Sequence, residues 1–345
     1  MNVAQQTLRF GRRLRRPDSG RIPVTIVTGF LGSGKTSLIK KLVETPVGEK
    51  SAIIVNEFGE IGFDQAILST DEQEAILLGN GCLCCSIRTD LQETMRALFV
   101  SRMRGEVDFN RVIIETSGLA DPGPLLQTFL TDRALAKEFH LSALIGVVDP
   151  LMFESTIASH PIARKQIALA DRIIVTKVDL ASETQCQKIE QLLGTLAHGR
   201  PVAFLRSGEV DAHFLLLEDI ILDGSDYTAL ADHSDHDGII SFPIIFAEPV
   251  QWDFFAEALR ILTQLRGRDI LRVKGLIAVA ESGGPVLIQA VQHLVHPPLT
   301  LQDWPDEDRW SRLTFITKGV TKDQVATLFE AIQKLEAPTF RSSRI

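Results

Sequence analysis

Residues 29–36, GFLGSGKT, constrain the fold of this chain more than any other part of its sequence. They fit the pattern G-x-x-x-x-G-K-[ST], in which glycines let successive backbone N–H groups turn toward phosphate oxygens. An apolar run, Val24 to Thr28, precedes the motif, and a helix-like stretch through Leu42 follows it. This strand–loop–helix context is the one that a phosphate site requires. The sequence therefore predicts a nucleotide site near its N-terminal end.

Each residue type in this motif has a chemical role. We expect Lys35 to reach the β and γ phosphates and the Thr36 hydroxyl to ligate Mg²⁺ at the helix N-terminus. A structural glycine turn is the alternative interpretation. The residues expected to bind nucleotide in this segment are Gly29, Gly32, Ser33, Gly34, Lys35, Thr36 and Ser37.

The order of apolar and helix-like segments predicts the fold of the first domain. Short β-branched runs alternate with helix-like stretches, which is typical of a doubly wound α/β domain with a mostly parallel P-loop sheet. Ser182 and Gln185 form a capping-box pattern ahead of an amphipathic run to about Leu196. The runs expected to be strands are Val24 to Thr28, Ala52 to Val55, Ala75 to Leu78, Val112 to Ile114, Ala143 to Val148 and Ile173 to Thr176.

A second, smaller α+β domain is predicted after a polar segment, DGSDYTALADHSDHDG. Its expected helices span about 251–265 and 321–335. Its expected strands are Ile239 to Phe246, Leu271 to Ala280, Val286 to Leu294 and Arg312 to Thr317. The predicted organisation is a basic flexible extension (1–21), a P-loop nucleotide-binding domain (22–222), an acidic, His-containing linker (223–238), a C-terminal domain (239–336) and a tail (337–345).

Charge and hydropathy exclude several classes of protein. The 345 residues include 36 basic and 44 acidic side chains, and six arginines fall within the first 21 residues, so the remaining body is acidic. An acidic body argues against a nucleic-acid-coating protein. No apolar run approaches the roughly 18 residues of a membrane span. The Arg-rich segment lacks the apolar core of a secretory signal, and we expect a cytoplasmic protein.

The segment RIIVTKVD, residues 172–179, predicts which base the nucleotide carries. It resembles the N/T-K-x-D element that reads guanine in GTPases. The Asp179 carboxylate can accept hydrogen bonds from guanine N1–H and the exocyclic amine together, whereas adenine offers no matching pair of donors. We therefore expect GTP, bound through Thr176, Lys177 and Asp179. An incidental TKVD at a strand end is the alternative.

The segment VIIETSG, residues 112–118, places Glu115 at the end of another apolar run and Gly118 three residues later. We expect the carboxylate to lie near Mg²⁺ or the attacking water, and the Gly118 N–H to sense the γ-phosphate. Lys35, Glu115 and Gly118 form the predicted catalytic set. Without the phosphate loop upstream, an acid at a strand end would be unremarkable.

Three of the four cysteines, Cys82, Cys84 and Cys85, follow the run that ends at Leu78. Loops after the strands of an open parallel sheet emerge at one edge, so these thiols should share an edge with the phosphate site. Three thiolates suit Zn²⁺, Cu⁺ or Co²⁺ and leave a fourth position for an exchangeable ligand, which favours metal transfer or sensing. Such a cluster also indicates a reducing compartment. A redox-active or loop-packing thiol group is the alternative.

Two acids, Glu57 and Glu60, also follow a predicted strand, and they can approach the same edge; a solvated acidic loop is the alternative. In the linker, His233 and His236 lie three residues apart among carboxylates and could collect Zn²⁺ weakly. A solvated linker explains these two histidines equally well.

The ordered set of motifs resembles the CobW-type GTPases, a SIMIBI-class P-loop family associated with metal trafficking. The motifs are GFLGSGKT, NEFGEIGFD, GCLCC, ETSGLADP and ADRIIVTKVDL, followed by a separate C-terminal domain. The resemblance implies that Cys82, Cys84 and Cys85 bind metal with help from Glu57 and Glu60. It also implies slow, metal-responsive GTP hydrolysis and a C-terminal domain that helps client recognition.

These observations lead to one main hypothesis and two alternatives. We expect a GTP-dependent metallochaperone that loads Zn²⁺ or Co²⁺ at the cysteine loop and delivers it to an apo-metalloprotein client on hydrolysis. A homo-oligomer is a further expectation. The first alternative is a nucleotide-dependent biosynthetic enzyme, of the cobalamin pathway or kinase-like, with structural or redox cysteines. The second is a module that stores or senses zinc.

Overall fold

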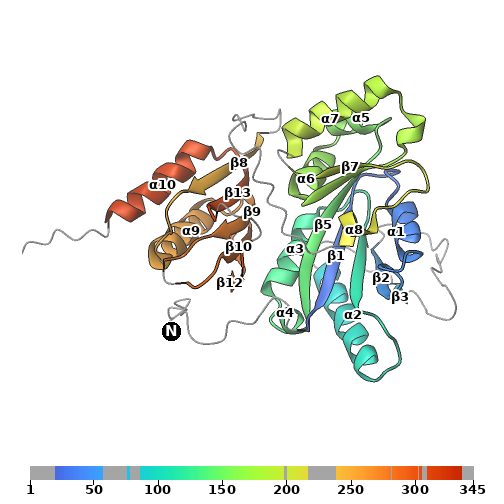
Figure 1. Ribbon diagram of the computed structural model, residues 1–345, viewed down its shortest axis with the longest axis horizontal. Helices are drawn as coiled ribbons and strands as arrows, with labels where there is room; N and C mark the ends of the chain where they lie inside the picture. The colour runs from blue at the N-terminus through green and yellow to red at the C-terminus, as the bar shows by residue number, and fades with distance from the viewer. Residues whose placement is uncertain are drawn as a thin grey trace, which may run out of the picture. The chain divides into compact units, whose positions relative to one another are not determined.

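The computed structural model describes residues 20–56, 76–77, 86–197, 200–216, 238–280, 282–301, 303–304 and 309–335. These residues divide into two compact units, one ending at Ser241 and the other starting at Phe242 (Figure 1). The predicted domain boundaries stay a prediction, because several of them fall outside the described ranges.

The first unit is built on a seven-stranded sheet in which every strand is parallel to its neighbours. The strand order is β3-β2-β4-β1-β5-β6-β7, so the strand of the phosphate motif, β1, is central. The strands are β1 (Ile22–Thr28), β2 (Ser51–Asn56), β3 (Ile76–Leu77), β4 (Arg111–Thr116), β5 (Phe139–Val148), β6 (Arg172–Val175) and β7 (Val202–Phe204).

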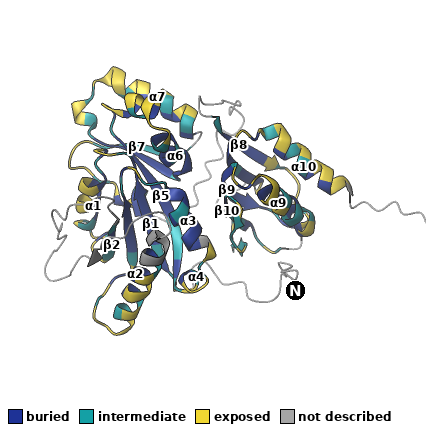
Figure 2. Cartoon of the chain, turned by 180° about the vertical axis from the view of Figure 1, so that it is seen from behind, coloured by how far each residue is buried: buried dark blue, intermediate teal, exposed yellow. Residues whose placement is uncertain are grey.

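Helices cover both faces of this sheet, as Figures 1 and 2 show. Alternation along β6 explains the two layers, because successive side chains of a strand point to opposite faces. Ile174 packs in one core with α1 and α8, whereas Ile173 and Val175 pack in another with α5, α6 and α7. The elements between the strands are α1 (Lys35–Val43), α2 (Ser86–Met103), α3 (Pro122–Thr131), α4 (Leu135–Glu138), α5 (Phe153–Ser159), α6 (Pro161–Leu169), the 3₁₀ turn η1 (Val178–Leu180), α7 (Glu183–Ala197) and α8 (Ala212–Leu216).

The predicted fold class of the first domain is confirmed. The capping box is also present, since the Ser182 N–H donates to Gln185 Oε1 at 2.9 Å and the Gln185 N–H donates to Ser182 Oγ at 3.3 Å ahead of α7. The edge strand β7 was not predicted, because its three residues are too few to show a periodic pattern.

The second unit is an antiparallel sheet with two long helices, which confirms the smaller α+β domain. β9 pairs antiparallel with both β10 and β13, and the path through the sheet is β11-β10-β9-β13-β8. Its core includes Phe255, Phe315 and Phe329, whose rings stand 5.6 to 6.4 Å apart in two contacts. The elements are β8 (Ile239–Phe246), α9 (Trp252–Arg266), β9 (Ile270–Ile277), β10 (Val286–Val291), β11 (Leu294–Val295), β12 (Leu299–Thr300), β13 (Ser311–Lys318) and α10 (Lys322–Leu335).

One strand prediction in this unit is wrong. The run Val286 to Leu294 was expected to be a single strand, but it contains β10, a reversal and the start of β11. Gln292 adopts φ 56°, in the left-handed region that tight reversals require, and Ala290 pairs back with Val295. An apolar run alone does not reveal such a turn, because Gln–His is a weak turn signal.

None of the helices in the described ranges is both long and apolar enough to cross a membrane.

Candidate functional site

The phosphate loop joins β1 to α1 and depends on three glycines for its path. Gly29 has φ 147°, and a Cβ there would lie 2.3 Å from the Val147 carbonyl oxygen of the neighbouring strand β5. Gly34 caps α1 with φ 93°, a backbone conformation that glycine adopts without strain. Gly32 also has positive φ, at 73°. The loop therefore reverses direction tightly and passes directly into the N-terminus of α1.

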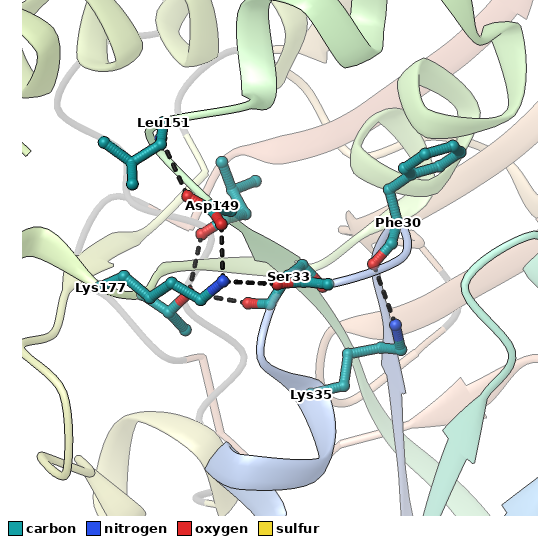
Figure 3. Close-up of polar contacts among 9 residues, drawn as sticks. Phe30, Ser33, Lys35, Asp149, Leu151 and Lys177 are labelled. Carbon is teal, nitrogen blue, oxygen red and sulfur yellow. Dashed lines mark hydrogen bonds and ion pairs between the residues drawn. The ribbon is translucent and has the colours of Figure 1, made fainter. Parts of the chain in front are cut away.

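Lys35 is folded back onto this loop. Its ammonium group donates to the Gly29 carbonyl oxygen at 2.9 Å, and the residue is buried. It also donates to the Phe30 carbonyl oxygen at 3.1 Å (Figure 3). Ser33 is buried as well, whereas Thr36 and Ser37 are exposed in the first turn of α1. The predicted phosphate ligands are thus gathered at the N-terminus of one helix.

The predicted base-reading segment contacts the phosphate loop directly. The Thr176 hydroxyl, buried after β6, donates to the Ser33 carbonyl at 2.7 Å, and Lys177 Nζ donates to the Gly32 carbonyl at 2.7 Å. In a trans peptide the C=O and N–H point in opposite directions. Holding the Ser33 carbonyl on the Thr176 side therefore turns the Gly34 N–H away from that side of the loop.

Asp179 lies on the exposed side of the same segment, within η1. Its Oδ1 accepts a hydrogen bond from the Ser207 N–H at 2.7 Å, which ties it to the loop after β7. Lys177 precedes η1 with φ 53°, an uncommon conformation for a residue with a side chain. This backbone turn directs Lys177 toward the phosphate loop while Asp179 remains accessible.

Asp149 is a site residue that the sequence reasoning missed. It follows the last residue of β5, and its Oδ2 lies 2.7 Å from Lys177 Nζ (Figure 3). The only signal in the sequence was an acid at the end of an apolar strand, the same feature that singled out Glu115.

Glu115 and Thr36 lie 79 residues apart in the sequence, and the fold brings their side chains into contact. The Thr36 hydroxyl donates to Glu115 Oε1 at 2.7 Å, and Glu115 is buried at the end of β4. A side-chain hydrogen bond also joins the ends of β4 and β1, because the Thr116 hydroxyl donates to the Thr28 hydroxyl at 3.0 Å. A hydroxyl and a carboxylate thus meet beside the start of α1.

Gly118 packs against the phosphate loop. A Cβ on Gly118 would lie 2.6 Å from the Leu31 backbone nitrogen. The fully buried Gln166 of α6 holds the same segment, since its Nε2 donates to the carbonyls of Gly118 at 3.1 Å and Ala120 at 3.0 Å. Sequence reasoning had no signal for Gln166, which lies inside a helix remote from any motif.

The predicted transition-metal ligands lie outside the described residues. They are Cys82, Cys84, Cys85, Glu57, Glu60, His233 and His236. The described chain brackets the cysteines closely, because β3 ends at Leu77 and α2 begins at Ser86. Within the described ranges, no group of three or more His, Cys, Asp or Glu side chains is placed to hold a metal ion.

Comparison with known families decides the relationship of this chain. Residues 23–204 match the CobW/HypB/UreG nucleotide-binding domain, which covers more than half of the chain. The chain belongs to the CobW/HypB/UreG family. Within that family it carries the cobalamin synthesis protein CobW C-terminal domain, matched by residues 239–333. The resemblance drawn from the motifs is confirmed.

Two bacterial proteins are similar to this CobW/HypB/UreG chain over most of their own length. The zinc chaperone YjiA of Escherichia coli is 30% identical over 320 residues, covering 91% of this chain and 99% of YjiA. The zinc chaperone CobW of Pseudomonas aeruginosa is 34% identical over 350 residues, covering 89% of each. The crystal structure of Zn(II)-bound YjiA GTPase superposes with a TM-score of 0.68 at 27% identity, covering 90% of this chain and 99% of that chain.

Proposed function

We propose that this CobW/HypB/UreG chain is a GTP-hydrolysing metallochaperone that loads zinc and delivers it to a client metalloprotein. GTP hydrolysis is supported by the 2.7 Å hydrogen bond between the Thr36 hydroxyl and Glu115 Oε1, which lies beside the phosphate loop. Two oxygen ligands at the N-terminus of a helix that begins with Lys35 are what a triphosphate site needs. Zinc loading and delivery are supported by the similar proteins that are named zinc chaperones.

GTP is the proposed nucleotide, and the contacts of the segment TKVD support this choice. Asp179 is exposed at the sheet edge, while Thr176 and Lys177 fasten its segment to the phosphate loop. A carboxylate held there can accept both guanine donors. Lys35 would leave the Gly29 and Phe30 carbonyls to bind phosphate oxygens.

Mg²⁺ fits the oxygen pair that the structure places together. Thr36 and Glu115 carry hard oxygen atoms of the kind that Mg²⁺ prefers, and they would hold the ion together with oxygen atoms of the nucleotide. When bound, the ion would neutralise charge that develops between the β and γ phosphates. The role of this chain is to hold the Thr36 hydroxyl and the Glu115 carboxylate on one side of the phosphate loop.

Gly118 is the proposed sensor of the γ-phosphate. Its segment contacts Leu31 of the phosphate loop and is hydrogen-bonded to Gln166 of α6. A movement of the phosphate loop on loss of the γ-phosphate would therefore act on this segment directly. Loops that contact a γ-phosphate rearrange when it leaves. We propose that this rearrangement changes metal affinity at Cys82, Cys84 and Cys85.

The strand order supports such a link between the nucleotide and the cargo metal. β3, which precedes the cysteines, is separated from β4 by one strand, so their ends lie roughly 10 Å apart at about 4.8 Å per strand spacing. The corresponding distance from β3 to β1 is roughly 14 Å. Both distances are short enough for one loop to span. Zinc is the favoured cargo, with cobalt as the second candidate, and Glu57 and Glu60 would assist the thiolates.

The partner we propose is an apo-metalloprotein in the cytoplasm, where thiols stay reduced. Large apolar side chains project at the nucleotide edge of the sheet, with Leu31, Leu119 and Leu180 each more than half exposed. An apolar rim of this kind is typical of a protein–protein contact. The C-terminal domain would add client contacts. The domain limits given above, the zinc-collecting role of His233 and His236, and a homo-oligomer stay predictions.

The proposal is tested by measuring hydrolysis and metal transfer in one preparation. Zinc-loaded protein is mixed with an apo-metalloenzyme client and either GTP or its non-hydrolysable analogue. We expect GTP to be hydrolysed in preference to ATP and client activity to appear only with GTP. Equal client activation with both nucleotides, or absence of GTP hydrolysis, would contradict the proposal.

A further inference from the structure

Asp149 occupies the position between the two nucleotide-reading segments. The phosphate loop follows β1 and the base-reading segment follows β6, and β5 lies between these two strands. Thr28 at the end of β1 pairs with Gly146, and Val175 at the end of β6 pairs with Val148. Asp149 is the first residue after β5, so its side chain emerges between the phosphate and base segments.

Both carboxylate oxygens of Asp149 have a defined partner. Oδ1 accepts from the Leu151 N–H at 2.9 Å, which fixes the turn toward α5, and Oδ2 binds Lys177 Nζ at 2.7 Å. The Asp149 side chain is only 12% exposed, whereas that of Lys177 is 34% exposed. The carboxylate is therefore rigidly held, and the longer, more accessible lysine is the group that it positions.

The ammonium group of Lys177 also contacts the phosphate loop. Lys177 Nζ donates to the Gly32 carbonyl at 2.7 Å (Figure 3). The N–H of that peptide, which belongs to Ser33, donates in the other direction to the Phe30 carbonyl at 3.2 Å. Hydrogen bonds at both its C=O and its N–H thus fix the orientation of this peptide. Asp149 supports the bond to the C=O, because it holds Lys177 in place.

We propose that Asp149 is a positioning residue that holds Lys177 on the Gly32 carbonyl, so that the phosphate loop and the base-reading segment meet the nucleotide as one preformed unit. A carboxylate beside a triphosphate site weakens anion binding by its own charge. Its neutralisation by Lys177 removes that cost and leaves the orienting effect. This inference rests on the proposed guanine-nucleotide site.

Asp149→Asn isolates the effect. Asparagine keeps an Oδ1 that can accept from the Leu151 N–H, so the turn toward α5 is preserved while the ion pair is lost. We expect the dissociation constant for GDP, measured by calorimetry, and the KM for GTP both to rise about tenfold, or about 1.4 kcal/mol, with kcat within about twofold of wild type. Lys177→Met should weaken binding similarly, and the double variant should be no weaker than Lys177→Met alone.

Two further variants complete the experiment. Glu154→Gln removes an ion pair of the same length, Lys188 to Glu154 at 2.7 Å, that is exposed on both sides, and it should bind GDP like wild type. Asp149→Glu keeps the charge and should recover part of the lost affinity. If Asp149→Asn is too unstable to purify, Lys177→Met and Asp149→Glu carry the same test.

The outcomes separate this inference from the proposed function. Wild-type protein that binds no guanine nucleotide would overturn both. Wild-type protein that binds GDP, with Asp149→Asn equally tight or with losses that add in the double variant, would overturn the positioning role alone. A lower melting temperature of Asp149→Asn with an unchanged dissociation constant would also overturn it, because that result describes a purely structural residue.

Discussion

Gly118 and Leu31 approach so closely that a Cβ on Gly118 would stand 2.8 Å from the Leu31 Cα. The loop after β4 and the phosphate loop are therefore in direct backbone contact. Any change in one of them when a γ-phosphate leaves must be accommodated by the other. Through this contact, a movement of the phosphate loop would be transmitted directly to the proposed sensor, Gly118.

A methyl group at this contact should impair hydrolysis. In Gly118→Ala the Cβ meets backbone atoms that no side-chain rotation can clear, so the phosphate loop must shift. We expect kcat for GTP to fall at least tenfold. Gly194→Ala is the matched control, because Gly194 lies in α7 with nothing within 4 Å of the added Cβ. That control should retain activity and gain about 0.5–1 kcal/mol of stability; equal activity of the two variants would refute the role of the contact.

The pairing of Thr36 with Glu115 predicts a magnesium-dependent defect. Glu115→Gln keeps the size of the side chain and its ability to accept from Thr36, but it removes the negative charge. We expect hydrolysis at saturating GTP to fall about a hundredfold and half-saturation by Mg²⁺ to move to higher concentration. A magnesium titration of GTPase activity measures both. Unchanged activity across the titration would exclude Glu115 from the catalytic set.

Lys35 should be indispensable for turnover. Removing its ammonium group in Lys35→Ala deletes the charge expected to meet the β and γ phosphates. It also deletes two hydrogen bonds to the loop carbonyls. Phosphate release should drop below detection while the circular dichroism spectrum stays native. GTPase activity near the wild-type level would mean that the phosphate loop has been assigned wrongly.

Asp179→Asn should change base preference without unfolding the segment. The substitution leaves an oxygen for the Ser207 N–H, which now holds Asp179 Oδ1 at 2.7 Å, and exchanges the other oxygen for an amide donor. That donor no longer accepts from guanine, but it can pair with the second carbonyl of xanthine. We expect GTP affinity to fall roughly a hundredfold and XTP affinity to rise. Competition binding with the two nucleotides checks this, and an unchanged preference for GTP would argue against base reading by Asp179.

Much of the nucleotide site could be predicted from the sequence because its determinants are local. The glycines at 29 and 34, the lysine and the threonine are fixed by one short motif. In the structure Gly29 follows β1, Gly34 caps α1, and Lys35 and Thr36 open that helix. Glu115 and the segment from Thr176 to Asp179 were identifiable because each ends an apolar run that becomes a buried strand. A regular α/β pattern then implies that such strand ends share one edge.

The residues that were missed depend on which strands become neighbours. Asp149 matters only because β5 lies between β1 and β6, and sequence periodicity does not determine strand order. Gln166 follows Arg164 and Lys165 in a helix of mixed polarity, and its role exists only because α6 packs beside the loop after β4. Tertiary placement, rather than propensity, makes both residues part of the site.

Zinc affinity in the two nucleotide states tests the central proposal most directly. Competition with a chromophoric chelator gives the zinc dissociation constant of the protein in the presence of Mg²⁺ with a non-hydrolysable GTP analogue, and again with GDP. A Cys84→Ser, Cys85→Ser variant should show no tight binding in either state. We expect the wild-type constant to be at least fivefold lower with the GTP analogue, and zinc to raise the affinity for the analogue relative to the affinity for GDP by the same factor. Equal zinc dissociation constants in the two states would contradict nucleotide-gated metal transfer.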